Sequence, residues 1–125
     1  MADLVEILNK KLNEFADDII LCFPEVSTDF DVFKTMLNVA VCVDKEAPLR
    51  MFEQCVVKPY EDYILNRNED FFLTETYDPS YTDINIVNKI KKVWKTMDEL
   101  NKSIVWKYLD VLLKLSKACV SQKTT

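Results

Sequence analysis

Pairs of adjacent carboxylates are the first residues in this sequence that could do chemistry. Three of these pairs are Asp17-Asp18, Glu61-Asp62 and Glu69-Asp70. Carboxylates that share a proton or a metal ion must converge on one point, but neighbouring side chains on a helix point about 100° apart. We therefore interpret the helical pair Glu61-Asp62 as part of a solvated surface and not as an acid–base or metal site.

A second candidate is the alternating set Asn66, Asn68 and Asp70, which has the spacing of the first ligands in a calcium-binding loop. That loop needs glycine at its sixth position and glutamate at its twelfth, where this chain has Phe71 and Tyr77. The sequence also contains no histidine, so no Ser-His or Cys-His pair and no Glu-x-x-His metal motif can form. We predict a non-enzymatic protein with no catalytic residue, metal or cofactor.

Glycine is also absent from the 125 residues. This excludes Gly-rich phosphate loops and removes the usual residue of hairpin turns and helix C-caps. The composition therefore favours helices, with asparagine expected to serve at the helix ends, and asparagine occurs in or beside the interhelical segments at positions 66, 68, 85, 88 and 101.

The four cysteines, Cys22, Cys42, Cys55 and Cys119, form no C-x-x-C pair, and each falls within an apolar run. We expect buried thiols in a reducing, cytoplasm-like compartment. Charges interrupt the N-terminal segment, so it does not resemble a signal peptide, and no run approaches the ~20 apolar residues of a membrane span.

Apolar residues at three- and four-residue spacing predict one all-α domain over residues 1–120, with residues 121–125 as a frayed tail. The expected fold is a single compact bundle of five or six helices. The first spans residues 3–22, the second starts at residues 27–29 and ends near 44, and the third starts at Pro48 and is broken or kinked by Pro59. Further helical segments are expected over residues 60–65, from 82–83 to about 97, and from there to the tail, where Thr96 and Glu99 have capping-box spacing. The predicted core comprises Leu8, Leu12, Phe15, Ile19, Phe33, Leu37, Phe52, Ile90, Trp94, Trp106, Leu109 and Leu112.

Residues 66–81 follow the helical pattern least and contain turn-forming residues at both ends. Because loops carry function more often than core elements, we expect a partner-binding surface here. Its candidate residues are Arg67, Glu69, Asp70, Phe71, Phe72 and Tyr77.

The charges are distributed unevenly along the chain. Residues 1–86 carry 18 acidic and seven basic side chains, whereas residues 87–125 carry three acidic side chains and nine lysines. One interpretation is that the two parts neutralise each other within the bundle. The other is a basic patch at Lys91, Lys92 and Lys95 that binds nucleic acid, although the chain has a net charge of −5 and no known nucleic-acid-binding motif.

The segment at residues 98–116 resembles a C-terminal segment of small helical proteins of large nucleocytoplasmic DNA viruses. The resemblance rests on Trp106, Lys107, Tyr108 and Leu109, followed by Leu112 and Leu115. It implies a viral helical protein, in the host cytoplasm or the virion. It assigns no catalytic residue to this sequence. A viral bundle would also permit a Bcl-2-like inhibitor of cell death, but the glycine of that family's signature is missing here.

Three functions therefore stay open at this point. The favoured one is a protein–protein interaction or structural module, and the alternatives are nucleic-acid binding and Bcl-2-like inhibition. A homo-oligomer is also plausible, since 14 aromatic residues are many for one small core.

Overall fold

The computed structural model describes residues 3–70, 90–91 and 93–123. Across these residues it contains five α-helices and no strand, which confirms the predicted all-α class. The helices are α1 (Leu4–Cys22), α2 (Ser27–Val43), α3 (Ala47–Phe52), α4 (Lys58–Leu65) and α7 (Glu99–Lys123). Short 3₁₀ turns lie at Pro24–Val26 and Trp94–Thr96. Helix α7 continues past residue 120, where the sequence pattern ended the folded domain.

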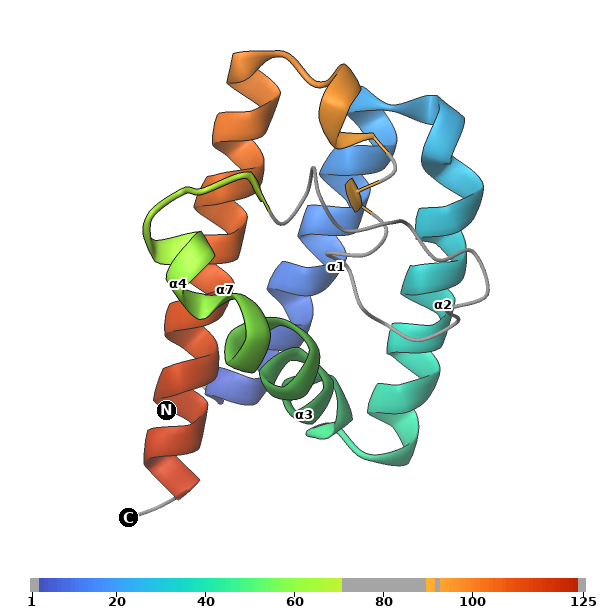
Figure 1. Cartoon of the computed structure of the whole chain (residues 1–125). Helices are drawn as coiled ribbons and strands as arrows, with labels where there is room; N and C mark the ends of the chain where they lie inside the picture. The colour runs from blue at the N-terminus through green and yellow to red at the C-terminus, as the bar shows by residue number, and fades with distance from the viewer. Residues whose placement is uncertain (1–2, 71–89, 92, 124–125) are drawn as a thin grey trace.

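Helix α1 is the central element of the bundle. It packs against α7 on one side and α2 on the other, and both neighbours run antiparallel to it (Figure 1). Helices α3 and α4 pack against α7, and α3 also contacts α1 and α2. The longest helices are thus held side by side, and the space between α1 and α7 is fixed by packing along most of their length.

The core confirms the predicted pattern of burial. All twelve residues expected in the core are at most 8% exposed, and Leu8, Phe15, Phe33, Leu37, Ile90, Trp94, Leu109 and Leu112 are fully buried. The two tryptophan rings meet edge to face, with centroids 5.4 Å apart, as aromatic pairs in cores prefer. Each buried apolar side chain contributes about 1.5–3 kcal/mol.

The ends of the long helices show which residues act as caps. The Asp3 side chain accepts a hydrogen bond from the backbone N–H of Val5 at 3.0 Å, so it caps α1. At α7 the cap is Asp98, whose carboxylate accepts from the N–H of Asn101 at 2.8 Å. The predicted capping box at Thr96 is therefore wrong. Thr96 lies in the preceding 3₁₀ turn, and its hydroxyl donates to a backbone carbonyl within that turn.

The sequence predicted that Pro59 would break or kink the third helix, and the structure shows no break. The chain stays helical from Ala47 to Leu65, and Glu53–Val57 form a π-helical turn between α3 and α4. Proline has no N–H to donate and its ring crowds the preceding turn, so a regular helix would be distorted here. In the wider turn the N–H of Lys58 donates to the carbonyl of Glu53, and Pro59 begins α4 as a first-turn proline.

Helix α4 ends without the glycine that such an end normally uses. Arg67 has a positive φ of 49°. Its N–H donates to the carbonyl of Ile64 at 3.1 Å, and the N–H of Asn68 donates to the carbonyl of Tyr63 at 2.8 Å. These are the two hydrogen bonds of a Schellman motif, with arginine at the left-handed position. The sequence predicted that asparagine would take this role, whereas Asn66 and Asn68 flank the residue that does.

Some stripe residues face solvent despite their spacing. Val43 and Leu100, at the C-terminal end of α2 and near the start of α7, are 84% and 71% exposed. Tyr63 on α4 is also exposed. No helix in the described part of the chain is long and apolar enough to cross a membrane.

Candidate functional site

The main concave surface among the described residues is a groove between α1 and the first half of α7. Its narrower half has a volume of about 240 Å³ and is lined by Phe15, Asp18, Ile19, Leu21, Cys22, Phe23, Asn101 and Ile104. Its wider half has a volume of about 330 Å³ and is lined by Lys11, Asp18, Ile104, Lys107, Tyr108 and Val111. The halves share Asp18 and Ile104, so we describe them as one surface, the α1–α7 groove.

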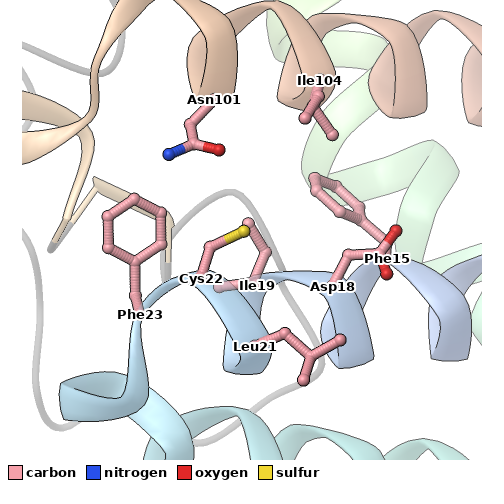
Figure 2. Close-up of a pocket in the computed structure, with 8 residues that line it drawn as sticks. All are labelled: Phe15, Asp18, Ile19, Leu21, Cys22, Phe23, Asn101 and Ile104. Carbon is pink, nitrogen blue, oxygen red and sulfur yellow. The ribbon is translucent and has the colours of Figure 1, made fainter.

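The narrower half is almost entirely apolar. Figure 2 shows Asn101 and Ile104 reaching from α7 toward α1, with Phe23 at one end of the pocket and Phe15 at the other. Leu21 stands at its edge and is 79% exposed. A leucine held in water beside an apolar pocket gains burial as soon as another apolar surface covers it.

A polar bridge crosses the groove where its halves meet. The hydroxyl of Tyr108 on α7 donates a hydrogen bond to the carboxylate of Asp18 on α1. The Tyr108 ring stacks on Phe15, with centroids 4.6 Å apart and planes 8° from parallel. Burial, followed by the hydrogen bond to Asp18, raises the pKa of Tyr108 above its usual value. The phenol is therefore protonated at neutral pH and acts as a strut between the helices, not as a base.

The exposed thiols depart from the prediction that the cysteines are buried. Cys22 lines the groove and Cys42 lies near the C-terminal end of α2, and both are exposed and free. Cys119 is buried as predicted, and burial raises the pKa of its thiol. Cys22 and Cys42 occupy the last turn of their helices.

The lysines of α7 are mostly paired with carboxylates. Lys102 lies 3.3 Å from Glu69, Lys114 lies 3.0 Å from Asp110, and Lys117 pairs with Glu61. Two of these three partners belong to the acidic first part of the chain, as the internal-neutralisation interpretation expects. Lys107 is exposed and forms no ion pair within the described ranges.

Glu69, a predicted partner-binding residue, is engaged within the protein. Its carboxylate accepts a hydrogen bond from the indole N–H of Trp94 at 2.9 Å, and the ammonium group of Lys102 lies 5.2 Å from the centre of the Trp94 ring. Trp94 is fully buried, so this carboxylate satisfies an interior donor. The sequence could not show this because the two residues lie 25 positions apart.

Arg67 and Asp70, two further predicted partner-binding residues, do not line the groove. Arg67 and Asp70 are exposed, and the backbone N–H of Asp70 donates to the Asn68 side chain in a local turn. Phe71, Phe72 and Tyr77 lie outside the described residues.

The structure describes two of the three lysines that were predicted to bind nucleic acid. Lys91 is half-buried, and its ammonium group lies 5.6 Å from the centre of the Tyr60 ring. Lys95 is exposed, and Lys92 lies outside the described residues.

The described residues offer no arrangement that would bind a metal. No group of three or more histidine, cysteine or carboxylate side chains converges within them. The groove combines an apolar floor with a tyrosine–aspartate hydrogen bond and with lysines at its wider half. Surfaces that bind other molecules often have this combination of apolar area and a few polar groups. Comparisons with protein-family models, curated proteins and solved structures found no match to the chain.

Proposed function

We propose that this protein is a non-enzymatic protein–protein interaction module that binds an amphipathic helix of a partner in the α1–α7 groove. The observation that carries the proposal is an apolar groove between two packed helices, with Leu21 exposed at its edge. A helix fits such a surface because it can place residues one turn apart into successive hollows.

The groove is suited to docking because its walls are held in place. The Tyr108–Asp18 hydrogen bond and the stacking of Tyr108 on Phe15 tie the two helices together where the halves of the groove meet. A preformed site loses little conformational entropy when it is occupied, so more of the apolar contact appears as affinity.

The proposal includes a reducing location and a viral origin. The exposed free thiols of Cys22 and Cys42 are compatible with a reducing compartment such as the cytoplasm. The viral origin rests on the resemblance of the C-terminal segment alone.

The test uses the two exposed thiols as a matched pair. In Cys42→Ser, a bulky maleimide is attached to Cys22 in the groove, and in Cys22→Ser the same reagent is attached to Cys42 outside it. Peptide mapping verifies the labelled positions, and Cys55 and Cys119 are the same in both proteins. A displayed library of amphipathic helices is then selected on the unlabelled protein.

We expect enriched helices that lose binding to the Cys22-labelled protein and keep binding to the Cys42-labelled one. The proposed function is wrong if no helix is enriched, or if both labelled proteins bind the enriched helices equally.

A further inference from the structure

We infer that the helix accepted by the α1–α7 groove carries a carboxylate that pairs with Lys107, beside the apolar residues that fill the groove. This inference rests on the proposed function and adds the charge of the partner to it. It follows from which of the lysines that line the groove already has a carboxylate partner and which has none.

Lysines line the wider half of the groove from both walls. Lys11 extends from α1 and Lys107 from α7. Lys11 has a carboxylate partner on its own helix, since its ammonium group lies 3.0 Å from Glu14. Lys107 has none among the described residues, although Lys102, Lys114 and Lys117 on the same helix all have one.

One carboxylate, that of Asp18, also lines the groove, and it makes no ion pair with Lys107. Asp18 accepts the hydrogen bond of the Tyr108 hydroxyl, at the boundary between the two halves. The narrower half contains no lysine and is apolar apart from Asp18 and Asn101. The groove thus has an apolar end and an end where the Lys107 ammonium group has no ion-pair partner among the described residues.

The helical spacing places that charge among apolar contacts. Ile104, Lys107 and Val111 follow one another at three- and four-residue steps, so they lie along one face of α7. A partner helix seated there would bring its own flank next to the Lys107 ammonium group. A carboxylate on that flank gains an ion pair, whereas a lysine or arginine would meet a like charge.

Selection on two proteins tests the inference. The helix library is selected in parallel on the wild-type protein and on Lys107→Glu, and a Lys95→Glu protein serves as the control. Lys95 is also an exposed lysine, but it does not line the groove, so its substitution makes the same change in net charge elsewhere.

Acidic residues should be enriched beside the apolar positions of helices selected on the wild-type protein, and basic residues in those selected on Lys107→Glu. Single wild-type-selected helices should bind Lys107→Glu roughly five- to tenfold more weakly at low salt, with a smaller difference at high salt, and Lys95→Glu with little change. Thiol labelling of Cys22 should slow when such a helix is bound, while labelling of Cys42 should not.

Groove-dependent helices with no charge preference, or with the same preference on both proteins, would overturn the inference and leave the proposed function standing. The absence of any helix sensitive to the Cys22 label would overturn both. A doubled mass in light scattering, with Cys22 protected in the protein alone, would show that a second copy occupies the groove, which also overturns the inference.

Discussion

Replacing Glu69 by alanine should destabilise the protein, because this partly exposed side chain satisfies the buried indole N–H of Trp94. A buried donor without an acceptor costs about 1–3 kcal/mol. The ion pair with Lys102 adds at most about 1 kcal/mol, because the Glu69 side chain is 41% exposed. We therefore expect Glu69→Ala to lower the free energy of unfolding by about 2 kcal/mol.

Glu69→Gln separates the acceptor from the charge. Glutamine keeps an oxygen that can accept the indole N–H, so we expect a loss of only about 0.5–1 kcal/mol. Asp62→Ala is the matched control, since it removes an exposed carboxylate from nearby α4 and should change stability by less than about 0.5 kcal/mol.

Urea unfolding at pH 7, followed by tryptophan fluorescence and circular dichroism, measures these differences. With a slope of about 2 kcal/mol/M, Glu69→Ala should unfold at a urea concentration about 1 M below wild type. A midpoint equal to that of wild type would refute the reasoning and return Glu69 to the candidates for partner binding. Equal losses in the alanine and glutamine variants would show that the charge matters and the acceptor does not.

Three other changes should give measurable effects. Tyr108→Phe should cost about 1 kcal/mol at pH 7 through the lost hydrogen bond to Asp18. Because the pKa of Tyr108 is raised by folding, its contribution is complete below the unfolded value near 10 and is lost at higher pH. The difference in unfolding free energy between wild type and Tyr108→Phe should therefore shrink above pH 10, and a constant difference would contradict the raised pKa. Asp98→Ala should cost about 1 kcal/mol as the loss of the α7 N-cap, measured by thermal unfolding, and an unchanged midpoint would argue against that cap. Val39→Ala should stabilise α2 by up to about 0.5 kcal/mol, since Val39 is 59% exposed and alanine favours helix more than valine does. Urea unfolding measures the change, and destabilisation would instead indicate that another molecule covers this face.

The sequence predicted the core because burial along a long helix follows a simple period. Leu8, Leu12, Phe15 and Ile19 repeat at three- and four-residue steps, and all four are buried where the pattern placed them. The same period continues to Val43 and Leu100, yet both are exposed, because the period shows which residues share a face of a helix but not what covers that face.

Sequence patterns predicted little of the candidate site. The groove joins residues that are far apart in the sequence, such as Asp18 and Tyr108, which lie 90 positions apart, and neither helix carries a motif that marks it. One signal was present, since Leu21 is a large apolar residue off the buried stripe of α1. The bond between Glu69 and Trp94 left no such signal, because either residue alone fits an ordinary surface or core position.

The π-helical turn at Glu53–Val57 has a consequence for the rotational phase of the helices around it. Phe52, Val56, Tyr60 and Ile64 are four residues apart, and all of them are buried or packed against the core. Each four-residue step overshoots a full turn of an α-helix by about 40°, so three steps would carry Ile64 about 120° away from the direction of Phe52.

One extra residue within a single turn reduces that rotation by about 100°. The wide turn therefore resets the angle at which α4 meets the core. Deleting the exposed residue Gln54 would shorten the chain by one residue, yet its main effect would be to rotate the inward face of α4 toward solvent.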